Sequence, residues 1–183
     1  RGRQVFVVCP RILPSNLDTR EALDTATLAR LEMKNVTEEY EKLSKKVFHD
    51  LKVVMLHGKM KGKQKADVME RFTKGHADIL VSTTVIEVGV DVPNATIMMV
   101  ESAERFGLAE LYQLRGRIGR KDVKAYAYFF YPRAKEWGDL SATAKERLNA
   151  IREFGELGCG MRLALRDLEI RGAGDMLGVR QHG

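Results

Sequence analysis

Residues 77–102 read ADILVSTTVIEVGVDVPNATIMMVES, two short apolar runs separated by a stretch of hydroxyl, acidic and glycine residues. A continuous apolar run that ends at polar or turn-forming residues is typical of a strand buried on both faces. The runs ILV and TIMMV therefore predict two buried strands. The hydroxyl-rich stretch between them follows the carboxyl end of the first strand, and in such sheets the chemistry gathers at these ends.

The same pattern continues on both sides of this stretch. Further strands are predicted at residues 5–9, 52–57 and 124–132, and a loop at residues 11–19. Amphipathic helices are predicted at residues 23–47, with a break near 35–37 where Thr37 would cap a second segment, and at residues 62–75, with Gly75 just beyond the helix end. Strands that alternate with helices predict an α/β fold with a mainly parallel sheet covered on both faces.

The pattern changes from about residue 141. A helix capped by Ser141 or Thr143 is expected first, then a second helix after the glycines at 158 and 160, and then a glycine-punctuated loop over residues 171–183. No strand pattern returns in this part of the sequence. We therefore predict two domains, a sheet domain at residues 1–140 and a helical hairpin with a tail at residues 141–183.

Composition limits the possible classes of protein only loosely. The sequence has 183 residues, 44% of them hydrophobic, and a net charge of +6, which is compatible with a polyanionic partner but does not identify one. Two cysteines without metal-ligand spacing favour a reducing compartment, and no apolar run approaches the roughly 20 residues that span a bilayer. We expect a cytoplasmic protein without a membrane partner. Because the chain begins without Met, we expect it to be part of a longer protein.

The segment YQLRGRIGRK, residues 112–121, places arginines beside glycines. On a helix, Gln113, Arg117 and Arg120 stand at i, i+4 and i+7 and would leave one face. Planar, permanently charged guanidinium groups match the oxygens of a phosphoryl group, and an arginine that neutralises a transferring phosphoryl group contributes roughly 10³ to 10⁵ in rate. The alternative is a solvated basic turn.

The loop after the strand at residues 79–81 combines two kinds of side chain. Ser82, Thr83 and Thr84 supply hydroxyls and backbone amides that suit a phosphate of a nucleic-acid backbone. Glu87 and Asp91 bring carboxylates to the same sheet edge, where they would orient an arginine or a ribose hydroxyl. Serine and threonine are also ordinary helix caps, and that alternative stays open.

Three of these segments, in this order and spacing, resemble a known family. HGKM at residues 57–60, STTVIEVGVDVPNA at 82–95 and QLRGRIGR at 113–120 look like motifs IVa, V and VI of the second RecA-like domain of superfamily 2 helicases. The tail at residues 166–183, RDLEIRGAGDMLGVRQHG, resembles the translocation motif shared by RecG-type helicases and transcription-repair coupling factors.

The resemblance implies roles for individual residues. Arg117 and Arg120 would act as arginine fingers toward ATP that is held by another motor domain. The nucleotide side would also include Gln113, Glu87, Gly89 and Asp91. The DNA backbone would be faced by His57, Gly58, Lys59, Ser82, Thr83 and Thr84. Arg171 and Gln181 would belong to the element that turns ATP-driven closure into stepping.

Two elements of a complete ATP site are missing from the sequence. No GxxxxGK[ST] segment occurs, and no Asp-Glu pair is present that would hold Mg²⁺ as a Walker B element. ATP and Mg²⁺ would therefore be bound mainly by the first RecA-like domain of the same parent chain. No metal site is expected within this chain, and the chain alone should not hydrolyse ATP.

Several alternatives remain at this point. Residues 12–47 and the sequence TTVIEVGVDVPNA favour a RecG-type parent that would act on branched or duplex DNA in recombination and fork repair. The segments EFGELGCGM and RGAGDML instead resemble the coupling factors, whose partner would be stalled RNA polymerase. A RecA-like binding module that has lost its motor, and an RNA helicase, are rivals. His57 would then be a capping or core histidine, and the lysines at 59, 61, 63 and 65 a solvated face.

Overall fold

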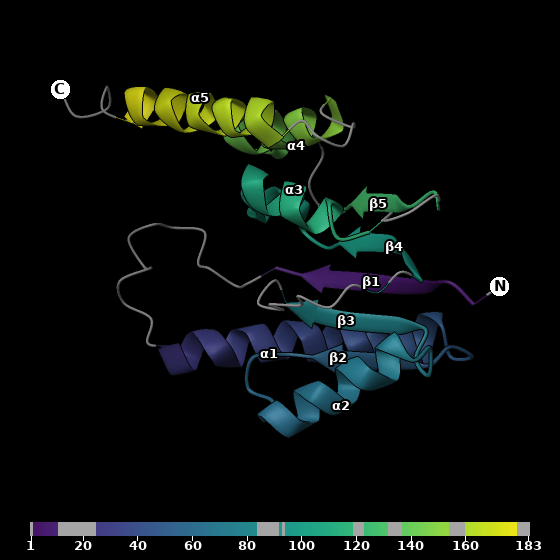
Figure 1. Cartoon of the computed structure of the whole chain (residues 1–183). Helices are drawn as coiled ribbons and strands as arrows, with labels where there is room; N and C mark the ends of the chain where they lie inside the picture. Colours follow the sequence, from purple (N-terminus) through teal and green to yellow (C-terminus); the bar gives the residue numbers. More distant parts are fainter. Residues whose placement is uncertain are drawn as a thin grey trace. The chain divides into compact units, whose positions relative to one another are not determined.

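The structure is a computed structural model that describes residues 2–10, 25–83, 92, 94–118, 123–131, 137–153 and 160–178. Its centre is a five-stranded sheet with the order β2-β3-β1-β4-β5 (Figure 1). The strands are β1 (Gln4–Cys9), β2 (Val53–Leu56), β3 (Ile79–Thr83), β4 (Ala95–Val100) and β5 (Tyr126–Phe129). Every strand pairing among the described residues is parallel. The predicted α/β fold with a parallel sheet is therefore confirmed.

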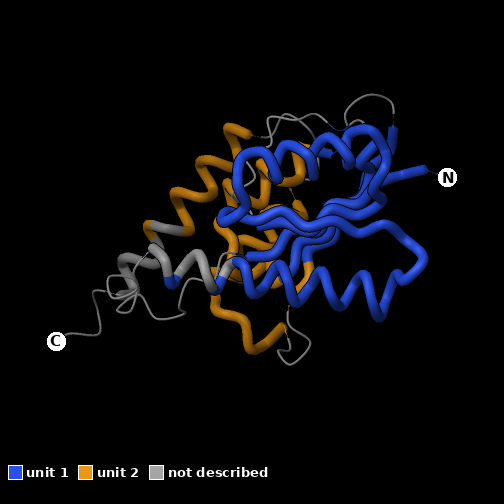
Figure 2. The backbone as a smooth tube through the Cα atoms, turned by 90° about the horizontal axis from the view of Figure 1, so that it is seen from below, with its two compact units in different colours: residues 1–101, 118–129 blue, residues 102–117, 130–183 orange. Residues whose placement is uncertain are grey.

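The chain divides into two compact units (Figure 2). Unit 1 comprises Arg1–Glu101 and Ile118–Phe129 and contains the whole sheet, and unit 2 comprises Ser102–Arg117 and Phe130–Gly183. The predicted domains at residues 1–140 and 141–183 stay a prediction.

One long helix of unit 1 covers part of the sheet. Helix α1 (Thr25–Lys42) continues without interruption into a π-helical segment, η2 (Leu43–Val47). The predicted break near residues 35–37 is wrong. Val36 is fully buried, and the Thr37 hydroxyl donates a hydrogen bond of 2.7 Å to the carbonyl oxygen of Met33 within the same helix. Because this hydroxyl bonds back to its own helix, it does not cap a new one.

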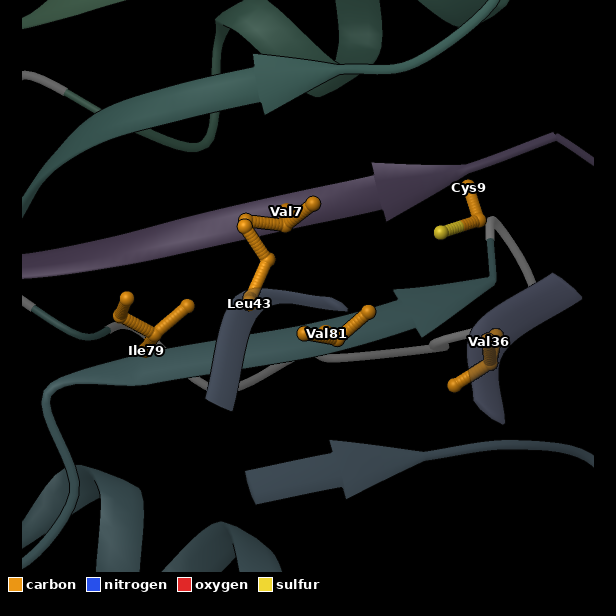
Figure 3. Packing of buried hydrophobic residues seen from close by; sticks show 6 residues of the cluster. All are labelled: Val7, Cys9, Val36, Leu43, Ile79 and Val81. Atoms are coloured by element: carbon orange, nitrogen blue, oxygen red, sulfur yellow. The ribbon is translucent and has the colours of Figure 1, made fainter. Parts of the chain in front are cut away.

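The core on this face lies between α1 and three strands. Helix α1 packs on β1, β2 and β3. Figure 3 shows the buried side chains that meet there, which are Val7, Cys9, Val36, Leu43, Ile79 and Val81. Burying an aliphatic side chain of this size contributes about 1.5–3 kcal/mol. The continuous apolar runs of β1 and β3 thus follow from burial on both faces.

The second helix of unit 1 is α2 (Gly62–Thr73), which packs on β2. Its Phe72 is fully buried, and the Phe72 ring lies 5.0 Å from the Phe6 ring between centroids. As predicted, Gly75 lies just beyond the helix end, and its φ of +74° is left-handed. The Gly75 amide donates to the carbonyl oxygen of Phe72 at 3.0 Å, and the His76 amide donates to that of Arg71 at 2.8 Å. This pair of bonds is a Schellman motif, which explains the glycine.

The described part of unit 2 is helical apart from its turns. It contains η3 (Ala103–Arg105), α3 (Leu108–Arg115), η4 (Trp137–Asp139), α4 (Ala142–Glu153) and α5 (Gly160–Gly178), and α3 packs on both α4 and α5. Ser141 is the predicted cap of α4, since its hydroxyl accepts a 3.2 Å bond from the Ala144 amide. None of the described helices is long and apolar enough to cross a membrane.

The tail prediction is wrong in its first part. Helix α5 continues through residues 171–178, where a glycine-punctuated loop was expected. Each glycine in a helix costs about 1 kcal/mol relative to alanine, but extending an existing helix adds one hydrogen bond per residue without a new nucleus. The three glycines in this stretch therefore weaken the helix without ending it before residue 178. Residues 179–183 lie outside the described part of the chain.

Candidate functional site

The carboxyl edge of the unit 1 sheet brings two predicted segments together. In the register of the sheet, Leu56 pairs with Ser82 and Cys9 pairs with Thr83. His57 directly follows β2, so it leaves the sheet beside the end of β3. The parallel sheet thus places His57 and the hydroxyl pair Ser82-Thr83 at one edge.

His57 combines partial burial with nearby positive charge. Its Nδ1 atom is buried and has no hydrogen-bond partner among the described residues. Burial lowers the pKa of His57, and the ammonium groups of Lys65 and Lys59 lower it further. The imidazole is therefore neutral at pH 7, with one nitrogen that donates and one that accepts. A capping role for His57 through Nδ1 finds no support in the described contacts.

The turn after His57 is open and basic. The Met60 amide donates to the carbonyl oxygen of His57 at 3.2 Å, which closes the turn. Gly58 and Lys59 are exposed, and no atom lies within 4 Å of where a Cβ of Gly58 would stand. Helix α2 begins immediately afterwards, so its amino-terminal amides add positive potential to that of the lysines. This combination suits a phosphate group.

The hydroxyl pair is less accessible than the histidine turn. Ser82 and Thr83 occupy the last two positions of β3, and each is only 2% exposed. Side chains this deeply buried are less available to a phosphate than the exposed Gly58 and Lys59. Direct contact of Ser82 and Thr83 with DNA stays a prediction.

Six predicted site residues lie outside the described part of the chain. They are Thr84, Glu87, Gly89, Asp91, Arg120 and Gln181. Arg171 belongs to α5, but its side chain is not among those described. The roles of all seven stay predictions.

The first part of the arginine segment, up to Arg117, lies in unit 2 and begins on α3. One face of this helix is buried through Leu108, Leu111 and Leu114, and Gln113 is exposed. The helix ends at Arg115, with Gly116 as its C-cap, so the exposed Arg117 lies beyond the helix. The prediction that Gln113 and Arg117 leave one face of a single helix is therefore wrong. Glycine has low helix propensity, and Gly116 is the C-cap at which α3 ends, immediately before Arg117.

Contacts from the hairpin hold α3 in place. A Cβ on Gly160, the first residue of α5, would lie 3.6 Å from the Tyr112 ring, so the α5 backbone approaches this ring closely. The Arg115 guanidinium lies 5.5 Å from the centroid of the same ring. Arg147 of α4 donates a 2.8 Å bond from Nη1 to the carbonyl oxygen of Phe106, just before α3. Helix α3, with the following residues up to Arg117, and the helical hairpin thus belong to one packed unit.

Two features of these units were not predicted. Arg147 was not recognised as a positioning residue, because a single arginine in an amphipathic helix gives no sequence signal. The other feature is a set of three charged side chains. Glu39 and Lys42 of α1 form a 2.9 Å ion pair, and Glu101 lies near this pair. Burial raises the pKa of Glu101, and the negative charge of Glu39 raises it further, while Lys42 opposes both. No group of three or more possible metal ligands occurs among the residues that the structure describes.

A parallel sheet with the order β2-β3-β1-β4-β5, followed by helices, defines a RecA-like α/β domain. The family model "Helicase conserved C-terminal domain" matches residues 4–122, and the chain belongs to this family. The predicted resemblance to the second RecA-like domain of superfamily 2 helicases is therefore confirmed.

Three similar proteins are informative. The chain is 45% identical over 183 residues to "ATP-dependent DNA helicase RecG" of Aquifex aeolicus, which covers 100% of this chain and 21% of that protein. It is 53% identical over 134 residues to "Transcription-repair-coupling factor" of Bacillus subtilis, which covers 73% of this chain and 11% of that protein. The solved "Structure of RecG bound to three-way DNA junction" shares 40% identity and a TM-score of 0.65 over 96% of this chain and 20% of that one. The chain thus spans about a fifth or less of these relatives.

Proposed function

We propose that this chain is the C-terminal motor half of an ATP-dependent translocase that acts on branched or duplex DNA. The single observation that supports this most strongly is the packing of α3, which leads to Arg117, against the helical hairpin α4–α5 within one unit. Arg117 is the proposed sensor of the phosphate, and the hairpin α4–α5 is the proposed element that moves DNA. Because both lie in one unit, they can move together. The relative named "ATP-dependent DNA helicase RecG" and the solved structure of RecG on a three-way DNA junction support the same assignment.

In this mechanism ATP supplies a phosphoryl group whose negative charge Arg117 and Arg120 neutralise. Arg117 fits this role because it is exposed just beyond the rigid end of α3. Mg²⁺ and most nucleotide contacts would come from the first RecA-like domain of the parent chain. Gln113, Glu87, Gly89 and Asp91 would complete the nucleotide side from this chain.

DNA would run along the carboxyl edge of the unit 1 sheet. The neutral His57, Gly58 and Lys59 would meet the phosphate backbone first, and Ser82, Thr83 and Thr84 would face the same backbone from the adjoining strand end. Closure of the two motor domains would shift this edge along the DNA. Unit 2, with Arg171 and Gln181, would transmit that shift to the duplex.

A RecG-type parent is favoured by the extent of the match. The Aquifex RecG match includes the whole chain, whereas the Bacillus coupling-factor match covers 73% of it. The second candidate is a coupling-factor motor that displaces stalled RNA polymerase, and the 53% identity favours it.

The test uses the intact parent protein. Its ATPase activity is measured with fork or four-way junction DNA, with linear duplex, and with RNA polymerase stalled on duplex. Strong stimulation by branched DNA together with fork unwinding is the expected result. Weak dependence on branching together with displacement of the polymerase would establish the coupling-factor function instead.

A further inference from the structure

The edge strand β5 presents a pair of tyrosine rings. Tyr126 and Tyr128 stand at alternate positions of β5, so both project from the same face of the sheet. They are 46% and 48% exposed. Their rings lie nearly parallel, at 18°, with centroids 6.4 Å apart. We call these two residues the tyrosine pair.

The tyrosine pair lies on the face that α1 covers elsewhere. Tyr126 pairs with Ile97 and Tyr128 pairs with Met99, and paired residues point to the same side of a sheet. Met99 packs against the cluster under α1, which identifies the face. Helix α1 packs on β1, β2 and β3, and Figure 1 shows it along that half of the sheet, with β5 at the opposite edge.

A cation accompanies the rings. The Lys124 ammonium lies 5.4 Å from the centroid of the Tyr126 ring. Lys124 is exposed and precedes Tyr126 by two residues, so the charge stands at one end of the tyrosine pair. A ligand on the rings would therefore meet a positive charge next to them.

We propose that the tyrosine pair and Lys124 form a binding site for single-stranded nucleic acid, with one base held between the two rings and a neighbouring phosphate at Lys124. Stacked bases are separated by roughly 3.4 Å, so a base held between two rings needs roughly 6.8 Å between them. The 6.4 Å separation of the rings is close to this value. Aromatic rings next to a cation are the combination by which proteins bind single strands without sequence preference.

A nucleic acid explains this surface better than a peptide does. An apolar peptide side chain would be served equally by aliphatic residues, whereas a base gains stacking from the flat faces of the rings and its phosphate gains the charge of Lys124. This site is separate from the proposed DNA edge, because it lies on the sheet face of β5 and not at the carboxyl ends of β2 and β3. It therefore does not depend on the proposed motor function.

The test measures binding of a fluorescently labelled twelve-nucleotide oligo(dT) and of a blunt duplex of equal length to the full chain. The double variant Tyr126→Leu/Tyr128→Leu keeps the side chains apolar but removes the stacking faces. Its matched control is Tyr126→Phe/Tyr128→Phe, which keeps them. The leucine variant is expected to bind oligo(dT) about 5- to 140-fold more weakly, as loss of one stacked base implies. The phenylalanine variant should bind within about twofold of the original chain, and duplex binding should not change in either variant.

The contribution of the Lys124 charge is measured separately, from the salt dependence of binding. Lys124→Gln should flatten the slope of log Kd against log salt concentration for oligo(dT) by about 0.7, the value for one phosphate contact on a single strand. An unchanged slope would remove Lys124 from the site.

A second measurement does not depend on the leucine variant folding. Tyr128→Trp in a Trp137→Phe background places the single indole of the chain in the pair, and stacking of a base should quench its fluorescence when oligo(dT) saturates the protein. Unquenched fluorescence at saturation, or leucine-variant binding within twofold of the original, would overturn the proposal. So would a dimer in solution that the leucine variant abolishes, because a second copy would then cover the rings. If the parent shows no DNA-stimulated ATPase but these binding results hold, the motor proposal fails and this site stands.

Discussion

Replacing Arg147 by methionine tests whether the hairpin holds the arginine segment in place. Arg147 is half-buried on α4 and donates at 2.8 Å to the carbonyl oxygen of Phe106 and, from Nε, at 3.2 Å to that of Thr143. Only the first bond links α4 to the turn before α3. A hydrogen bond to a charged group contributes about 1.5–3 kcal/mol, and partial solvation here favours the lower end. Methionine keeps most of the aliphatic stem, so lost packing adds little.

The expected loss is therefore about 1.5–2 kcal/mol in the free energy of unfolding of unit 2. For a chain of this size, each kcal/mol lowers Tm by roughly 2–4 °C, which predicts a decrease of about 3–8 °C. Differential scanning calorimetry, with Trp137 fluorescence as a probe inside unit 2, measures this. Arg152→Met is the matched control, because Arg152 is exposed on the same helix and should shift Tm by less than about 2 °C.

The functional consequence is measured in the intact parent as base pairs unwound per ATP hydrolysed. Arg147→Met should lower this ratio more than it lowers ATP turnover, because the motion of α3 would reach the hairpin less completely. Equal Tm shifts for Arg147→Met and Arg152→Met would refute the assigned contact. An unchanged ratio with a lowered Tm would show that the contact stabilises unit 2 without transmitting motion.

Three further predictions concern unit 1. Phe72→Ala should lower the free energy of unfolding by about 3–5 kcal/mol, because the ring is fully buried against Phe6. Amide hydrogen exchange in β3 measures this, and the same effect from Thr73→Ala, at an exposed position of the same helix, would contradict it. Glu101→Gln should stabilise the protein at pH 7. The folded pKa of Glu101 is raised, so its contribution is present below the unfolded pKa of about 4.5 and is lost as pH rises through the folded pKa. Urea unfolding of both proteins should therefore coincide near pH 4 and separate at pH 7, and a constant difference across this range would contradict the assignment. Finally, burial and nearby carboxylates raise the pKa of Cys9 to about 12, so in a Cys159→Ser background the folded protein should resist alkylation at pH 8, and labelling as fast as in urea would refute this.

The sequence predicted those features that follow from burial or from a single residue's backbone preference. The apolar runs of the five strands, Gly75 at positive φ and Ser141 as a cap were all identified correctly, because each depends on local chemistry. The parallel sheet followed from the alternation of strands and helices.

The wrong predictions concern helix ends and breaks, where a local sequence signal competes with burial or with extension of the helix. Helix α1 passes through Thr37 because Val36 is buried against the sheet, which a local cap signal cannot reveal. Helix α3 ends at Arg115, so Gln113 and Arg117 do not share a helical face. Helix α5 continues through the glycines that were expected to end it. Arg147 was missed because its partner is a backbone carbonyl 41 residues away in the sequence.

The most direct test of the motor assignment is DNA-stimulated ATP turnover by the intact parent with Arg117→Ala. Arg115→Ala is the control, since the Arg115 guanidinium lies against the Tyr112 ring. We expect Arg117→Ala to lower kcat by about 10³- to 10⁵-fold while DNA binding stays within about twofold, and Arg115→Ala to retain most turnover. Unchanged turnover in Arg117→Ala together with weakened DNA binding would contradict this expectation, and would show that this RecA-like domain holds nucleic acid without serving the ATP site.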